Sequence, residues 1–222
     1  MAERKGDILV INPNSNPAVT TGMDQALDAF RFAEGPSIRC ATLAEGPLGI
    51  ETQRDVESVT LPLRRLVEAD NAADAFVIAC YSDPGLHLCR EGTRRPVFGI
   101  AECAVLTALA RGDRFGVIAI AAASMRRHLR YLRQMGLTDR LAGERPLEMS
   151  VAETASGAGT LARMIEVGRT LVREDGADVV VMGCAGMSRH RAPLEEALGV
   201  PVVDPTLAAV TMAIGAVTAA RA

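Results

Sequence analysis

The chain has little aromatic character and almost no lysine. Aromatic residues make up 3% of the 222 positions, tryptophan is absent, and the only lysine is Lys5. A pyridoxal phosphate enzyme needs a lysine in its site for the Schiff base, and Lys5 belongs to a predicted N-terminal tail. Chemistry at an α-carbon is therefore expected to proceed without pyridoxal phosphate.

Other absences exclude further classes of protein. The net charge is -3 with no Lys/Arg block, which disfavours binding to nucleic acid or to an anionic membrane. No secretory hydrophobic region follows Met1, and the longest apolar run, Leu207–Ala220, is too short to span a bilayer. The five cysteines form no CxxC motif and predict no disulfide framework. A reducing cytoplasm fits these features best.

Metal and nucleotide sites are not expected. His87, His128 and His190 show no metal-binding spacing and no matched carboxylates, and no Walker motif or Rossmann fingerprint occurs. His190 stands between two arginines and is predicted on a solvated helix face.

Short apolar runs alternate with longer amphipathic stretches, which predicts an α/β fold with parallel sheets. The expected strands are Ile8–Asn12, Ser37–Leu43, Ala75–Cys80, Pro96–Gly99, Phe115–Ile120, Leu147–Val151, Val179–Cys184 and Pro201–Val203. The expected helices include Val19–Phe30, Asp55–Glu68, Met125–Met135, Leu161–Glu174 and Thr206–Ala220. Asn16-Pro17 and Asp83-Pro84 each predict a helix start, with a capping side chain followed by proline.

The chain carries an internal duplication. The segment that ends at Cys80 recurs 104 residues later in the segment that ends at Cys184, and Pro96 and Pro201 follow at similar distances. Each half therefore predicts one lobe with four strands and four helices. Since the last helix is expected to pack back on the first lobe, we predict an N-terminal lobe of residues 1–98 plus 206–222 and a C-terminal lobe of residues 99–205.

The matched cysteines are the candidate catalytic residues. Each stands where a parallel strand ends, the edge at which ligands bind in open α/β sheets. Helix N-termini there favour an anion, so a thiol pKa is expected to fall by roughly 1–5 units. The alternative is that each is a small buried apolar residue, which is the reading we keep for Cys40, Cys89 and Cys103.

The loops beside these strand ends add polar and small residues. Asn12, Asn14 and Ser15 follow the first strand, although a turn with a helix cap would explain them equally well. Tyr81, Ser82 and Asp83 follow Cys80, and Asp83 is also expected as the cap of the helix that comes next. Small residues flank Cys184 and allow the backbone to approach a ligand; they are Gly183, Ala185 and Gly186.

Five motifs in order resemble the hydantoin racemase branch of the aspartate/glutamate racemase superfamily, nearly from end to end. They are Ile11-Asn12-Pro13-Asn14-Ser15, Gly46-Pro47 with Ile50-Glu51, Ala79-Cys80 with Asp83-Pro84-Gly85-Leu86, Gly99-Ile100-Ala101-Glu102, and Met182-Gly183-Cys184-Ala185-Gly186-Met187. In two places the chain differs from the branch: Tyr81-Ser82 replaces the more common Phe-Gly, and no threonine occurs in the Ala119–Ala123 segment.

The resemblance implies two pseudo-symmetric lobes, each a four-stranded parallel sheet flanked by helices, with the active site in the cleft between them. It implies a cofactor-independent racemase that acts at a carbon α to a carbonyl, with Cys80 and Cys184 as its two bases. Related arylmalonate decarboxylases retain only the second cysteine. The substrate-binding residues implied by the motifs are Asn12, Asn14, Ser15, Ile50, Tyr81, Ser82, Asp83, Gly183, Ala185 and Gly186.

The expected substrate is a 5-substituted hydantoin or allantoin, and the enzyme is expected to be a cytoplasmic homo-oligomer. Three alternatives remain: an amino-acid racemase of the aspartate or glutamate type, a decarboxylase or isomerase of the same superfamily, and a two-lobed protein that only binds a small ligand.

Overall fold

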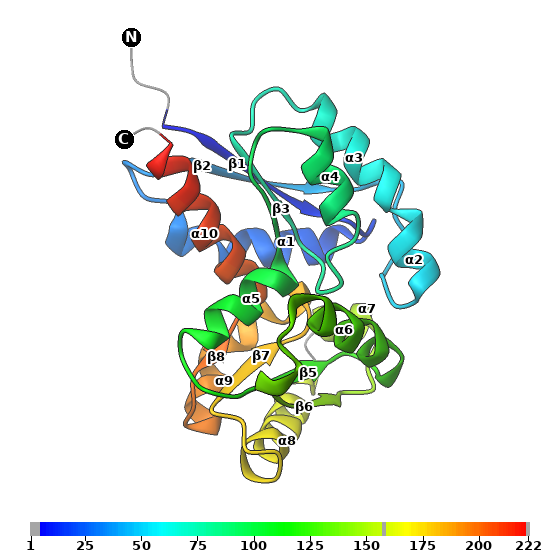
Figure 1. Cartoon of the computed structure of the whole chain (residues 1–222), viewed down its shortest axis with the longest axis vertical. Helices are drawn as coiled ribbons and strands as arrows, with labels where there is room; N and C mark the ends of the chain where they lie inside the picture. Colours follow the sequence, from blue (N-terminus) through cyan, green and yellow to red (C-terminus); the bar gives the residue numbers. More distant parts are fainter. Residues whose placement is uncertain (1–4, 157–158, 221–222) are drawn as a thin grey trace.

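The computed structural model describes residues 5–156 and 159–220, and it consists of two lobes, each built on a four-stranded parallel sheet (Figure 1). The strand orders are β2-β1-β3-β4 and β6-β5-β7-β8, which match position by position. The strands are β1 (Asp7–Asn12), β2 (Ser37–Thr42), β3 (Ala75–Ile78), β4 (Val97–Gly99), β5 (Phe115–Ala119), β6 (Leu141–Pro146), β7 (Val179–Met182) and β8 (Val202–Val203). The predicted fold class and duplication are confirmed.

The helices repeat in the same order in both halves. The connection before β3 carries two helices, α2 and α3, and so does the equivalent connection before β7, with α7 and α8. The helices are α1 (Pro17–Ala26), α2 (Gln53–Ser58), α3 (Thr60–Ala69), α4 (Leu86–Gly92), α5 (Ile100–Leu109), α6 (Ala122–Met135), α7 (Val151–Ser156), α8 (Thr160–Arg173), α9 (Arg191–Leu198) and α10 (Pro205–Ala219). Short 3-10 segments are η1 (Asp28–Phe30), η2 (Thr138–Arg140) and η3 (Ala185–His190). The stretch expected as one helix over Asp55–Glu68 is thus two helices that meet at Val59.

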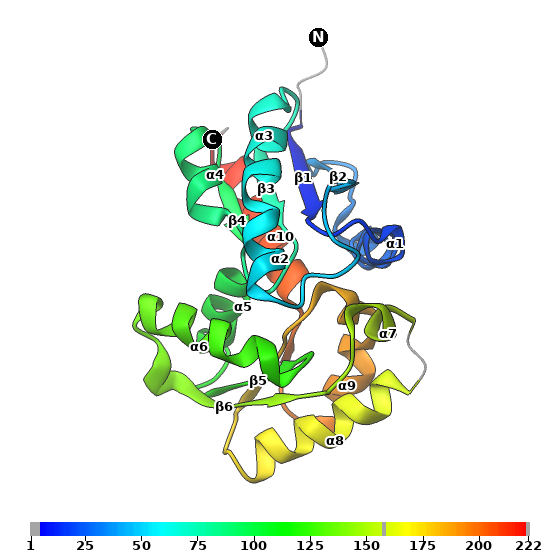
Figure 2. The same ribbon diagram turned by 90° about the vertical axis from the view of Figure 1, so that its right-hand side faces the viewer.

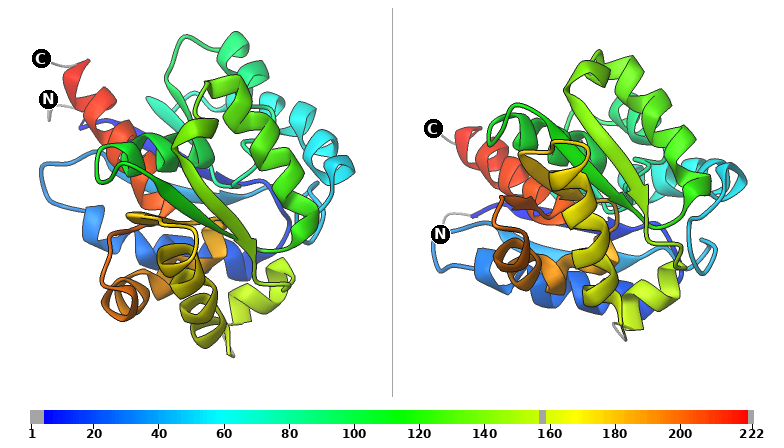
Figure 3. Two further views of the ribbon diagram at one scale, coloured as in Figure 1. Left: turned by 60° about the horizontal axis from the view of Figure 1, so that its bottom comes forward. Right: turned by 90° about the horizontal axis from the view of Figure 1, so that it is seen from below.

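Alternate side chains of each strand enter different cores, because the strands are covered on both faces. Ile8 and Val10 of β1 point into a central core that also holds α5, α10 and one face of the second sheet. Leu9 and Ile11 point the other way, into a core with α2, α3 and α4. On the second sheet, α8 and α9 form the corresponding outer core, and α8 lies at the far end of the molecule (Figures 2 and 3).

The last helix returns to the first lobe. α10 packs against β1, β3 and β4 as well as α5, and Figure 1 shows it beside the first sheet. The predicted lobe boundaries at residues 98/99 and 205/206 stay a prediction. Residues 1–4 and 221–222 of the first predicted lobe and 157–158 of the second lie outside the described residues.

The expected strand over Leu147–Val151 is wrong. The strand in this part of the chain is β6, which ends at Pro146 before the expected range, and Val151 instead begins α7. β6 is an edge strand of its sheet and is partly exposed along its length. Edge strands tolerate glycine, charged residues and proline, so the sequence Leu141–Pro146 does not show the apolar run that marks the central strands.

The helix start at Asn16-Pro17 is confirmed. Asn16 is extended, its side chain accepts a hydrogen bond from the Ala18 N–H, and Pro17 is the first helical residue. α10 begins in the same way, with the Asp204 carboxylate accepting from the N–H groups of Thr206 and Leu207. Among the described residues, no helix is both long and apolar enough to cross a membrane.

Candidate active site

The two matched cysteines lie in equivalent positions of the two lobes. Cys80 comes two residues after the end of β3 and Cys184 two residues after the end of β7, whereas the sequence predicted that each strand runs up to its cysteine. β3 and β7 are inner strands of parallel sheets, so both thiols leave the carboxyl edge of their sheet. Both line one cavity between the lobes.

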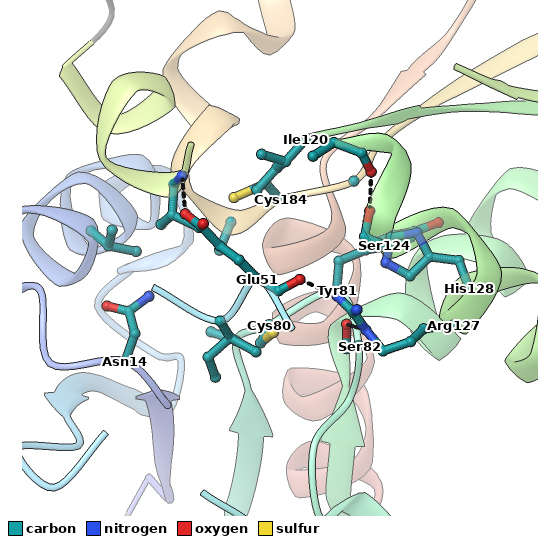
Figure 4. Close-up of a pocket in the computed structure, with 17 residues that line it drawn as sticks. Asn14, Glu51, Cys80, Tyr81, Ser82, Ile120, Ser124, Arg127, His128 and Cys184 are labelled. Atoms are coloured by element: carbon teal, nitrogen blue, oxygen red, sulfur yellow. Dashed lines mark hydrogen bonds between the residues drawn. The ribbon is translucent and has the colours of Figure 1, made fainter. Parts of the chain in front are cut away.

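The cavity is small, with a free volume of ≈ 60 Å³. In the close-up, the two sulfur atoms enter it from opposite sides, with Asn14 and Glu51 nearby (Figure 4). The residues that line it are Asn14, Val19, Ile50, Glu51, Ala79, Cys80, Tyr81, Ser82, Ile120, Ala121, Ser124, Arg127, His128, Val151, Gly183, Cys184 and Ala185. A substrate in this space would have a thiol on each face.

Six of the ten predicted substrate-binding residues line this cavity: Asn14, Ile50, Tyr81, Ser82, Gly183 and Ala185. The other four, Asn12, Ser15, Asp83 and Gly186, do not. Contact of all ten residues with substrate stays a prediction.

Two of the residues outside the cavity wall support residues that form it. The Asn12 side chain donates hydrogen bonds to Asn14 Oδ1 and Thr20 Oγ1, each at 3.0 Å, and so fixes Asn14. The Gly186 N–H donates to Cys184 Sγ at 3.3 Å. Only glycine fits at position 183, because a Cβ atom there would lie 2.5 Å from the Ile118 carbonyl oxygen.

Asp83 does not cap the helix that follows it in sequence. α4 begins at Leu86 after Gly85, with no side-chain cap. The buried Asp83 carboxylate instead accepts hydrogen bonds from the Ala101 and Glu102 N–H groups, each at 2.9 Å. It therefore caps α5, which it reaches because its own backbone is left-handed, with φ 42°. The predicted Asp83-Pro84 helix start is wrong.

Replacing Asp83 by alanine is expected to lower the free energy of unfolding by about 0.5–2 kcal/mol, the usual cost of losing a helix cap. Asp83→Asn is the matched control, because asparagine keeps one acceptor oxygen and tolerates a positive φ. Urea unfolding should show a smaller decrease in the free energy of unfolding for Asp83→Asn than for the alanine variant. Equal midpoints for all three proteins would show that the carboxylate does not stabilise α5.

Burial, rather than a helix terminus, governs the two thiols. It raises the pKa of Cys80 to about 12 and that of Cys184 to about 11. The opposing effects are weaker: the Ser82 N–H lowers the pKa of Cys80, and the Gly186 N–H and the Thr154 hydroxyl lower that of Cys184. The expected fall in thiol pKa is therefore wrong, because burial removes much of the water that would solvate a thiolate.

One face of α6 forms the part of the site that sequence reasoning missed. Ser124, Arg127 and His128 all line the cavity, and their i, i+3, i+4 spacing puts them on one side of the helix. That spacing was the only sequence feature that could have indicated a shared helix face. It did not stand out, because α6 carries other arginines, and a helix rich in arginine is usually exposed to solvent.

His128 belongs to a buried polar cluster, contrary to the expectation that no histidine has a matched carboxylate. Its Nδ1 lies 2.5 Å from Glu144 Oε1, and both side chains are almost fully buried. Its ring packs edge-on against Tyr81, with centroids 5.0 Å apart. Because Tyr81 directly follows Cys80, this contact links the second lobe to the loop of the first catalytic candidate.

Arg127 and Glu51 also join the lobes. Arg127 donates to Ser82 Oγ at 3.4 Å and to the Glu51 carbonyl oxygen at 3.2 Å. Glu51 Oε1 in turn accepts from the Val151 N–H at 3.1 Å. Figure 4 shows both side chains reaching into the cavity from opposite lobes. Glu51 therefore holds the start of α7 against the first lobe.

His190 is buried on η3 and does not lie on a solvated helix face. It does not line the cavity, and its Nε2 lies 3.3 Å from Arg189 Nε. Within residues 5–156 and 159–220, no group of three or more His, Cys, Asp and Glu side chains could hold a metal ion.

Comparison with known proteins identifies close relatives of the chain. The model of the Asp/Glu/hydantoin racemase family matches residues 8–213. The hydantoin racemase of Paenarthrobacter aurescens is 38% identical over 211 residues, which cover 93% of this chain and 89% of that protein. Allantoin racemase from Klebsiella pneumoniae has a similar structure, with a TM-score of 0.92 at 29% identity, over 97% of this chain and 89% of that chain. Allantoin racemase from Pseudomonas fluorescens has a TM-score of 0.91 at 27% identity, over 96% of this chain and 92% of that chain.

Proposed function

This chain belongs to the Asp/Glu/hydantoin racemase family and is a racemase of that superfamily, and we propose that it racemises 5-substituted hydantoins or allantoin with Cys80 and Cys184 as its two bases. The observation that carries this proposal is the pair of thiols that enter one cavity from equivalent positions of the two lobes. Inversion at one carbon needs a base on each face, and a duplicated fold supplies them.

The proposed reaction starts with one thiol ionised and the other protonated. The thiolate removes the proton from the carbon next to the carbonyl, and the electron pair of the C–H bond moves into an enolate. The thiol on the other face then gives its proton to that carbon. The proton count is unchanged, and the two cysteines have exchanged ionisation states, so the next turnover runs in the opposite direction.

The raised thiol pKa values suit this chemistry. A thiolate whose pKa is about 11 or 12 is a stronger base than an ordinary cysteine. A hydantoin ring carbon is a weak acid, so a strong base in a water-poor cavity improves the match between donor and acceptor. No cofactor is needed to take up the electrons, since the neighbouring carbonyl does so.

A neutral cyclic amide is the proposed substrate class. Apolar side chains such as Val19, Ile50, Ile120 and Val151 make up much of the cavity wall. Relatives with hydantoin and allantoin racemase activity also resemble this chain over nearly its whole length. The presence of both cysteines favours racemisation over decarboxylation.

The wild-type protein is expected to abolish the circular dichroism of single enantiomers of 5-isopropylhydantoin and allantoin, after dialysis against chelator and without pyridoxal phosphate. The control is the double variant Cys80→Ser/Cys184→Ser, which measures uncatalysed racemisation. Inversion of aspartate or glutamate alone would favour an amino-acid racemase, and binding without turnover would favour a ligand-binding protein. The predicted homo-oligomer and cytoplasmic location do not bear on this test and stay predictions.

A further inference from the structure

Arg127 brings a positive charge into the cavity without a directly bonded carboxylate. It extends from α6 of the second lobe toward Ser82 and Glu51, on the side of the cavity where Cys80 lies (Figure 4). Its hydrogen-bond acceptors are all neutral: Ser82 Oγ at 3.4 Å, the Glu51 carbonyl at 3.2 Å and the Ala123 carbonyl at 3.5 Å. In the part of the chain that the structure describes, it forms no ion pair. The half-buried guanidinium therefore has no directly bonded counter-charge, and the carboxylates of Asp55 and Glu144 attract it only at longer range.

The guanidinium also has N–H donors that bind no acceptor among the described residues. Arginine carries five N–H groups, and three of them have acceptors among the described residues. Burial lowers the pKa of Arg127, yet an arginine stays protonated in proteins. Two charged N–H groups thus remain for a ligand in the cavity, where low polarity strengthens their interaction with a negative oxygen.

We propose that Arg127 is the charged electrophile of the reaction, donating a hydrogen bond to the carbonyl oxygen next to the carbon that inverts. This inference rests on the proposed function, because it needs a substrate that becomes an enolate. When the thiolate takes the proton, the negative charge leaves sulfur and appears on the carbonyl oxygen. Arg127 stabilises this oxygen without forming a bond to it, and the charge returns to the other sulfur when that thiol donates its proton.

The other polar groups of the cavity are weaker candidates for this function. A Glu51 carboxylate would repel an enolate, and His128 is paired with Glu144. The side-chain oxygen of Asn14 accepts from Asn12, so its amide group is a neutral donor. Neutral donors are also weaker than a guanidinium toward a full negative charge. Among the described residues that line the cavity, Arg127 is therefore the best placed to meet the charge that develops in the transition state.

The test compares Arg127→Met with Arg130→Met. Arg130 lies one turn further along α6, is exposed, and also bridges the lobes, by a 2.8 Å hydrogen bond to Gln53 Oε1. Like Arg127, it lies on α6, carries a positive charge and contacts the first lobe, but it does not line the cavity. We expect Arg127→Met to lower kcat by about 10²–10³-fold, as for loss of an oxyanion donor, and Arg130→Met to stay within about three-fold of wild type. Thermal unfolding of both variants checks that they are folded.

A second readout separates an electrophile from a residue that only holds the lobes together. A phenyl group delocalises carbanion charge away from oxygen, so Arg127→Met should lose less kcat with 5-phenylhydantoin than with 5-isopropylhydantoin. Arg127→Met with kcat near wild type, or with an equal loss on both substrates, would overturn the inference while wild-type racemisation still upheld the proposed function. A wild-type protein that racemises neither these hydantoins nor allantoin would instead refute the proposed function itself.

Discussion

Cys80→Ser and Cys184→Ser are each expected to lose racemisation by about 10²–10⁴-fold, the range for loss of a general acid or base. Serine is nearly isosteric with cysteine, but its hydroxyl is a far weaker acid than a thiol. In either variant, one face of the substrate keeps its base and the other face has none. The measurement is the rate at which 5-isopropylhydantoin loses its circular dichroism.

Isotope exchange should distinguish the two variants. In deuterated water, Cys184→Ser leaves Cys80 able to remove the proton from one enantiomer and return deuterium to the same face. Cys80→Ser should exchange the opposite enantiomer. Mass spectrometry would then show deuterium uptake without inversion, with opposite stereochemical preference in the two variants.

Cys40→Ser is the matched control, because Cys40 is a partly buried cysteine outside the cavity. It should racemise both enantiomers at the wild-type rate. If Cys80→Ser or Cys184→Ser behaved like this control, that cysteine would be structural, and the two-base mechanism would be refuted.

The sequence predicts the strands correctly where they lie inside a sheet. β3 and β7 are buried along their whole length, so their apolar runs stand out and their repetition reveals the duplication. β6 was misplaced because an edge strand needs no apolar run. Its Glu144 side chain is buried and pairs with His128 of α6, and such a pairing between distant segments leaves no local pattern.

The sequence predicts only part of the site, because contacts between distant segments leave no local pattern. Residues at strand ends, such as Cys80 and Cys184, are placed by the topology of a parallel sheet. Arg127 and His128 enter the cavity because the second lobe closes over the first, and helix α6 alone does not show which of its faces meets the other lobe. The raised thiol pKa values have the same origin, since they depend on water being excluded by both lobes.

Catalytic efficiency is expected to rise steeply with pH in the alkaline range. The active form needs one ionised thiol, and burial holds the pKa values of this coupled pair at about 12 for Cys80 and about 11 for Cys184. Below the first ionisation of the pair, the thiolate fraction increases ten-fold per pH unit. From pH 7 to pH 10, kcat/KM should therefore increase by about 10³-fold, which makes initial rates over this range the measurement. A kcat/KM that is flat between pH 7 and pH 10 would show that a thiolate already exists in the free enzyme.

The same burial should make the fold less stable as the activity rises. A buried thiol whose folded pKa exceeds its unfolded value of about 8.5 stabilises the fold fully below pH 8.5, and this contribution is lost as the pH rises through the folded pKa. Burial raises the pKa of Cys103, which lies outside the cavity, to about 12. Cys103→Ala should therefore weaken the loss of stability above pH 8.5, measured by urea unfolding, and leave the slope of kcat/KM unchanged. A variant that changed the kinetic slope would contradict the assignment of that slope to the two cavity thiols, because Cys103 contributes only to the stability of the fold.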